Sequence, residues 1–251
     1  MNMRAEDTEY NFVRAEELLE RAARGTDAVI LPEVWNTGFF PKDNIHSLAD
    51  KDGKRAKALF EKISKKYKTA VIGGSVTEEK DGKIYNTAYI FNEEGECISS
   101  YSKTHLFSYM NEDGFYEKGD GISIFTIGGI KAGVIICYDL RFPELTRRLA
   151  YDGAEILFVP CQWPSERTEL MKTLLKGRAA ENQMFGVLCN SCGTFNETVY
   201  GGHSLAVSPL GEVIKEAGSD EEILFLEIDT AKVKALRNEF RVFSDIRKDL
   251  Y

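Results

Sequence analysis

Apolar runs of strand length recur along the whole chain, and they constrain its fold more than any other feature. Clear examples are 28–31, 132–136 and 156–159, each next to a proline or a charged residue. Buried strands have this length and composition. Helical apolar spacing over 11–24 and 54–67 separates several of these runs. Strands that alternate with helices predict an α/β fold.

Turn residues join other strand candidates into hairpins. Gly128-Gly129 is a two-residue connection of the hairpin type, and Asn92-Glu93-Glu94-Gly95 separates the strand candidates 83–91 and 97–102. Further expected elements are a strand at 69–76, helices from Pro143 and over 166–182, and strands at 186–189, 204–207 and 223–228. Hairpins mixed with strand–helix–strand units predict mixed sheets covered by helices.

Composition narrows the class of protein. The formal net charge of −8 disfavours a non-specific nucleic-acid surface, and no apolar run approaches the roughly 18 residues of a membrane span. The first residues are polar, which argues against a signal peptide. Five cysteines without an export signal indicate reduced thiols. With no linker or repeat, we expect one domain over 1–251, cytoplasmic, with neither nucleic-acid nor membrane partners.

Cys137 is the most informative single position. It ends the apolar run 132–136 and precedes Tyr138, Asp139 and Arg141, with a helix expected from Pro143. Sites in α/β folds gather where strands end, and a helix N-terminus favours a thiolate. A buried packing cysteine would explain the apolar run equally well, but it seldom borders such a polar turn. The pattern therefore favours a nucleophile.

A thiol nucleophile needs a base and a group that holds developing negative charge. Glu33 follows one apolar strand and Lys103 follows another, so both could meet Cys137 at one edge of a sheet. Each alone is more often a solvated charge. A pair of Cys137 with His105 or His203 stays open on chemistry alone.

Three separated motifs together resemble the nitrilase (carbon–nitrogen hydrolase) superfamily. They are Leu31-Pro32-Glu33, the segment 102–107 (SKTHLF) and the segment 133–144 (GVIICYDLRFPE). The segments 153–157 and 177–182 continue the likeness, which covers nearly the whole chain. The resemblance implies a four-layer α-β-β-α sandwich and an amide-hydrolysing enzyme without a cofactor. No zinc-type spacing, G-x-G-x-x-G or P-loop pattern occurs.

The resemblance also implies roles for individual residues. Glu33 corresponds to the family's general base, Lys103 to the residue that stabilises the tetrahedral intermediate, and Cys137 to the nucleophile. The backbone N–H of Tyr138 corresponds to the second donor of the oxyanion hole.

A second active-site glutamate of the family lies between its lysine and its cysteine. Glu112 and Glu117 are the candidates, and Glu112 is preferred because Met110-Asn111-Glu112 has the spacing of the omega-amidase branch. The other cysteines become packing residues, except that Cys161 is expected in a loop that lines the pocket.

The segments 33–39 and 160–167 resemble the branch that hydrolyses omega-amides of small dicarboxylic acids, such as 2-oxoglutaramate. Arg141 is the candidate anchor for the substrate carboxylate, although an ion pair with a nearby acidic residue would explain it equally well. Phe39, Tyr138 and Trp163 are expected as apolar walls of the pocket.

Other readings remain open at this level. The protein could instead belong to a branch that hydrolyses N-carbamoyl amines or nitriles. A non-catalytic scaffold with this fold is a further alternative. By resemblance we expect a homodimer or larger homo-oligomer, to which 240–247 could contribute. Met1-Asn2-Met3 matches only the end of the family's first strand, so that strand is expected to be truncated.

Overall fold

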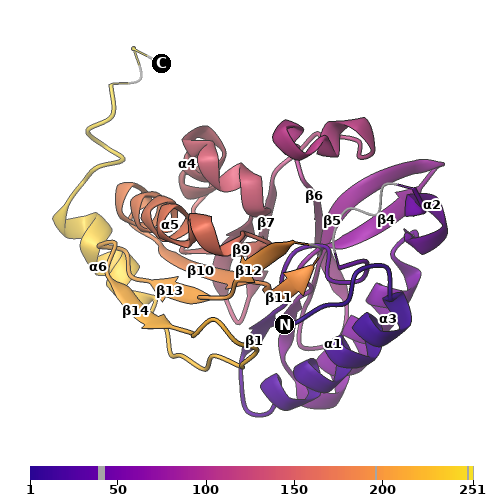
Figure 1. The fold of residues 1–251 in the computed structure, drawn as a ribbon. Helices are drawn as coiled ribbons and strands as arrows, with labels where there is room; N and C mark the ends of the chain where they lie inside the picture. Colours follow the sequence, from indigo (N-terminus) through magenta and orange to yellow (C-terminus); the bar gives the residue numbers. More distant parts are fainter. Residues whose placement is uncertain (39–42, 196, 248, 251) are drawn as a thin grey trace.

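Two β-sheets face each other, and helices cover the outer face of each (Figure 1). The computed structural model describes residues 1–38, 43–195, 197–247 and 249–250. The fold class predicted from the sequence is confirmed: α/β with mixed sheets between helical layers.

The first sheet contains parallel and antiparallel pairs. Along its main path the order is β1 (Ala28–Ile30), β3 (Ala70–Ile72), β5 (Lys83–Phe91), β4 (Val76–Lys80) and β2 (Asp50–Lys51), while β6 (Cys97–Ser102) also pairs with β5. β3 and β4 pair with successive stretches of β5. They are separate strands because Gly73 and Gly74 interrupt the predicted strand 69–76, and Gly74 has a φ of +64°.

The second sheet carries the nucleophile candidate. Its order is β14 (Val213–Glu216), β13 (Leu205–Val207), β10 (Phe185–Asn190), β9 (Ile156–Cys161), β8 (Ile130–Val134) and β7 (Ser123–Ile127). A separate hairpin, β11 (Cys192–Phe195) with β12 (Thr198–Gly201), was not predicted. β8, β9 and β10 are parallel, so their carboxyl ends lie at one edge.

Amphipathic helices close the two outer faces. α1 (Thr8–Ala22) and α3 (Lys54–Tyr67) pack on the first sheet, and α4 (Pro143–Tyr151) and α5 (Thr168–Asn182) pack on the second (Figure 1). The Asp7 carboxylate caps α1 by accepting from the N–H of Tyr10 at 3.0 Å. The smaller helical elements are α2 (Ile45–Leu48), α6 (Ala231–Glu239), η1 (Ser108–Met110), η2 (Glu112–Gly114), η3 (Cys137–Arg141) and η4 (Ser165–Arg167).

Three apolar clusters separate the four layers. One lies between the first sheet and its helices, one between the two sheets, and one between the second sheet and its helices. In the cluster between the sheets, Ile72 and Ile90 meet Val134 and Phe158. Burial of such side chains contributes about 1.5–3 kcal/mol each, which holds the sheets face to face.

One predicted strand is wrong. Residues 223–228 pair with no strand in the described parts of the chain, although Leu224, Leu226 and Ile228 are half-buried and alternate with exposed Phe225 and Glu227. Their alternation therefore reflects one face packed on the core without a hydrogen-bonded neighbour.

At the other end of the chain, Met1 and Met3 are buried in the cluster beneath the first sheet. Asn2 forms an isolated parallel bridge with Cys192. The described residues thus place this segment beside the β11–β12 hairpin rather than within either large sheet.

Candidate active site

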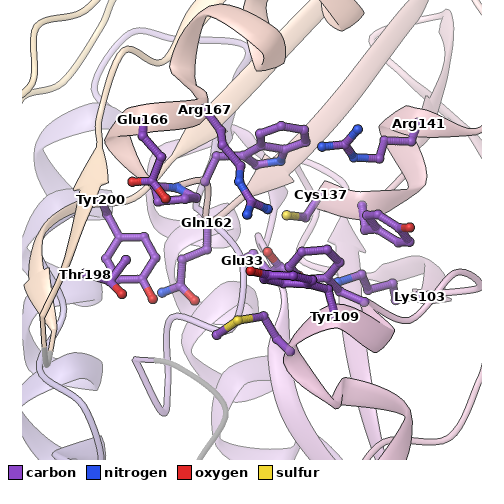
Figure 2. Close-up of a pocket in the computed structure, with 15 residues that line it drawn as sticks. Glu33, Lys103, Tyr109, Cys137, Arg141, Gln162, Glu166, Arg167, Thr198 and Tyr200 are labelled. Carbon is purple, nitrogen blue, oxygen red and sulfur yellow. The ribbon is translucent and has the colours of Figure 1, made fainter.

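A cavity of about 190 Å³ opens where the two sheets end (Figure 2). Glu33, Lys103 and Cys137 all line it, each from a different segment of the chain. We call it the Cys137 pocket. The three strand-end residues singled out from the sequence therefore converge, but from two sheets rather than at one edge of a single sheet: Glu33 and Lys103 follow strands of the first sheet, and Cys137 follows β8 of the second.

Lys103 lies at the centre of a buried charge network and is only 1 % exposed. Its Nζ donates to Glu33 Oε1 at 2.9 Å and to Glu112 Oε1 and Oε2 at 3.0 and 2.8 Å. Burial would lower the pKa of Lys103, but the charges of Glu33 and Glu112 outweigh it and hold this pKa well above its ordinary value. The pocket therefore keeps a permanent ammonium beside the thiol.

Backbone contacts explain why these residues meet. Glu33 follows β1, and its N–H donates to the carbonyl of Cys161 at 3.3 Å, across the two sheets. Lys103 follows β6, and its N–H donates to the carbonyl of Asn86 on β5 at 2.9 Å. Each side chain is thus fixed at a strand end, as the sequence suggested.

Cys137 is the first residue of η3, at a strained turn that follows β8. Its φ is +47°, in the left-handed region that residues other than glycine seldom adopt. The buried Asp139 carboxylate fixes this turn by accepting from the N–H of Ile136 at 3.0 Å, the N–H of His105 at 2.9 Å and the hydroxyl of Tyr101 at 2.7 Å. Strain held by surrounding contacts is common at reactive positions.

The resting state of the nucleophile follows from its surroundings. Burial raises the pKa of the Cys137 thiol, and the Glu33 carboxylate raises it further, whereas the Cys161 thiol and the Lys103 ammonium lower it. The net effect is upward, so the thiol is protonated at neutral pH. Attack by this sulfur therefore requires a base.

The two glutamate candidates have different surroundings. Glu112 is fully buried on Lys103 and also accepts from the N–H of Phe107 at 2.6 Å. Glu117 lies at the surface, 3.5 Å from Lys83. The geometry therefore places Glu112, and not Glu117, in the charge network.

The chain matches the carbon–nitrogen hydrolase family model over residues 1–238. It belongs to this family. It is 40 % identical to the 2-oxoglutaramate amidase of Bacillus subtilis over 241 residues, covering 96 % of this chain and 93 % of that protein. It is 33 % identical to the omega-amidase NIT2 of Danio rerio over 257 residues, covering 96 % and 90 %.

Solved structures give the same result for the fold. A superfamily protein from Xanthomonas campestris, with an arsenic adduct in its active site, superimposes with a TM-score of 0.91 at 28 % identity, covering 98 % of this chain and 94 % of that one. Nit3 of Saccharomyces cerevisiae, a member of branch 10 of the nitrilase superfamily, gives 0.86 at 30 % identity, covering 95 % and 90 %. The predicted family and enzyme class, a carbon–nitrogen hydrolase, are confirmed.

The histidines of this hydrolase lie away from the pocket lining. His105 contacts Asp139 at 2.8 Å and stacks on Phe142, and His203 contacts Glu216 at 2.7 Å near the surface. None of the lining residues in the described ranges is a histidine. The geometry gives the alternative Cys–His pair no support.

Three of the four residues expected to bind substrate lie around the pocket, and their contact with a substrate stays a prediction. Arg141, Tyr138 and Trp163 line the pocket, and the Arg141 guanidinium lies 5.8 Å and 5.1 Å from the centroids of the Tyr138 and Trp163 rings. Phe39 lies outside the described residues. The expectation that Cys161 lies in a pocket-lining loop is wrong: it is the buried last residue of β9, and in this segment the lining begins at Gln162. Its backbone carbonyl accepts from the N–H of Glu33.

Asn86 was missed by the sequence reasoning. Its Nδ2 donates to Glu33 Oε1 at 3.0 Å and to Glu112 Oε1 at 3.2 Å, so one amide bridges both carboxylates. No local sequence pattern marks this position, and only the structure shows Asn86 to be fully buried within β5. A polar residue there requires buried partners.

The hydrolase has no evident metal site or membrane span in the parts that the structure describes. Groups of histidine, cysteine and carboxylate side chains suited to a metal are absent from these residues. Among the same residues, every helix is too short or too polar to cross a bilayer.

Proposed function

We propose that this carbon–nitrogen hydrolase is an omega-amidase, which cleaves the terminal amide of a small dicarboxylic acid monoamide such as 2-oxoglutaramate. The observation that carries the proposal is the convergence of Cys137 with the buried Glu33–Lys103–Glu112 network in one pocket. The amidases among its relatives support the choice of an amide substrate.

In the acylation step, Glu33 accepts the thiol proton as Cys137 Sγ forms a bond to the amide carbonyl carbon. The carbonyl oxygen becomes an oxyanion, to which Lys103 Nζ and the backbone N–H of Tyr138 donate. Removing one donor of this kind costs about 2.7–4 kcal/mol in other hydrolases. Glu33 then returns the proton to the amide nitrogen, the C–N bond breaks, and ammonia leaves a thioester on Cys137.

In the deacylation step, Glu33 accepts a proton from water as the water oxygen attacks the thioester carbon. The same donors hold the second oxyanion. The C–S bond then breaks, the thiol recovers its proton from Glu33, and the carboxylic acid leaves. Glu112 acts on Lys103, because its two oxygens hold the ammonium in place.

Arg141 gives the pocket a cation for the second carboxyl group of such a substrate. Within the described residues it has no carboxylate within 4.0 Å, so its guanidinium stays available to an anion while it stacks on Trp163. The apolar rings of Tyr138 and Trp163 suit a short methylene chain.

Ammonia release from a panel of substrates tests the proposal. We expect kcat/KM for 2-oxoglutaramate to exceed the values for an aliphatic nitrile and for an N-carbamoyl amine. The reverse order would assign the protein to another branch of the family. No hydrolysis of any member, with a folded protein, would favour the non-catalytic scaffold.

A further inference from the structure

Arg167 is a second arginine in the Cys137 pocket, and the proposed chemistry does not use it. It ends η4, directly before α5, and Figure 2 shows its guanidinium pointing from that loop into the middle of the pocket. The guanidinium carbon lies 5.9 Å and 5.3 Å from the centroids of the Phe107 and Tyr109 rings. The charge is thus held against an aromatic wall.

No carboxylate neutralises this charge in the parts of the chain that the structure describes. Arg167 and Arg141 form no ion pair there, and neighbouring Glu166, which also lines the pocket, lies more than 4.0 Å from the Arg167 nitrogens. Lys103, by contrast, is balanced by two carboxylates. The pocket therefore presents two guanidinium groups that have no carboxylate partner in these parts of the chain, and an anionic ligand can pair with them.

Another residue of the pocket lining, next to Arg141, also carries a polar group that lacks a partner within the described ranges. The indole Nε1 of Trp163 is buried and has no hydrogen-bond partner among the described residues, and Trp163 is only 4 % exposed. Buried donors are rarely left unpaired. A carboxylate beside a 2-oxo group offers several acceptor oxygens, which suits two guanidinium groups.

We propose that Arg167 is a specificity-determining residue that binds the substrate carboxylate together with Arg141. The inference rests on the proposed omega-amidase function and deepens it. A guanidinium that stacks on rings keeps its N–H edge available for bidentate hydrogen bonds to a carboxylate. Arg167 thereby favours acidic amides over neutral amides of the same length.

The test compares kcat/KM for 2-oxoglutaramate with that for pentanamide, a neutral amide of the same chain length. In Arg167→Gln we expect the charged-to-neutral ratio to fall about 10- to 100-fold, mainly through KM, the scale of a hydrogen bond to a charged group. Arg167→Lys keeps the charge but loses the bidentate geometry, so its ratio should fall less.

The matched control is Arg148→Gln, which removes a cation from the exposed side of α4, where Arg148 pairs with Asp152. It should keep the wild-type ratio. An equal loss for both amides in Arg167→Gln would indicate a structural role, and an unchanged ratio would show no contact with the carboxylate. Either result overturns the inference.

The outcome also separates this inference from the proposed function. If the wild-type enzyme hydrolyses pentanamide as well as 2-oxoglutaramate, the proposed substrate class is wrong whatever Arg167 does. If the wild-type enzyme prefers 2-oxoglutaramate, and Arg141→Gln but not Arg167→Gln removes that preference, only the role of Arg167 is wrong.

Discussion

Replacing Lys103 by methionine tests the buried charge network directly. The substitution keeps an unbranched side chain of similar length but removes the ammonium that holds Glu33 and Glu112. Both carboxylates then stay buried without a counter-charge. Removing one partner of a buried ion pair costs roughly 3–5 kcal/mol.

The remaining contacts set the expected value within that range. Glu112 keeps the N–H of Phe107 and the Asn86 amide as donors, and Glu33 keeps the same amide. We therefore expect a loss near the lower limit, about 3 kcal/mol in the free energy of unfolding. For a chain of this size that corresponds to a fall in Tm of about 6–12 °C.

The loss should depend on pH. Burial raises the pKa of Glu112 and Lys103 opposes this rise, so without Lys103 the pKa of Glu112 increases further. A carboxyl whose folded pKa lies above its unfolded value stabilises the fold when protonated, and this stability disappears as the pH rises through the folded pKa. The deficit of Lys103→Met should therefore be largest at pH 8 and smaller at pH 5.

Urea unfolding followed by circular dichroism at both pH values measures this deficit. Lys51→Met, at an exposed position of β2, is the matched control and should stay within about 0.5 kcal/mol of the wild type. A deficit that is absent, or that is the same at pH 5 and pH 8, would refute the reasoning about the buried charges.

The same variant separates two chemical mechanisms. If Lys103 holds the oxyanion, ammonia release by the folded variant should fall about 10²- to 10³-fold or more. If a histidine activates Cys137 instead, activity should largely survive. Comparison at a temperature well below the variant's Tm keeps unfolding out of the result.

Three further substitutions and one pH profile test other parts of the site. Cys137→Ala should abolish ammonia release with an unchanged circular dichroism spectrum; residual turnover at the wild-type rate would exclude this nucleophile. Asn86→Leu should cost about 1–3 kcal/mol in urea unfolding and lower kcat, because two buried carboxylates lose a donor; a change in neither would mean that the bridge is dispensable. Asp139→Asn should lower kcat by a larger factor than it changes KM. The amide NH₂ then faces the Ile136 N–H and the Tyr101 hydroxyl, the donors that hold the Cys137 turn. Alkylation of Cys137 by iodoacetamide should become half-maximal above pH 9, because burial raises the pKa of its thiol, and a plateau reached by pH 7 would contradict that direction.

Local patterns predicted much of the fold. The helix 54–67 and the hairpin 83–91 with 97–102 have the observed bounds, because an amphipathic face and a turn sequence mark their limits. The segment 223–228 has strand-like alternation, yet strand formation depends on a hydrogen-bonded neighbour that its own sequence does not specify. The β11–β12 hairpin carries too little apolar alternation to be recognised.

Some residues of the candidate site could likewise be predicted from the sequence, and others could not. Glu33, Lys103 and Cys137 each follow a strand, so their meeting at strand ends could be predicted. Their origin in two facing sheets, rather than at one edge of a single sheet, could not. The roles suggested for Asn86 and Arg167 depend on tertiary contacts: Asn86 faces two carboxylates from other segments, and Arg167 meets two rings from the η1 region. Residues distant in sequence create these contacts, and neither position has a distinctive local pattern.

The hydrogen bond from the Glu33 N–H to the Cys161 carbonyl joins the two sheets beside the nucleophile. The general-base candidate belongs to one half of the sandwich and the nucleophile to the other. The rate of turnover therefore depends on how well the two halves of the sandwich are packed against each other. A substitution that loosens the apolar layer between the sheets, far from any substrate, should slow the reaction before the secondary structure is lost.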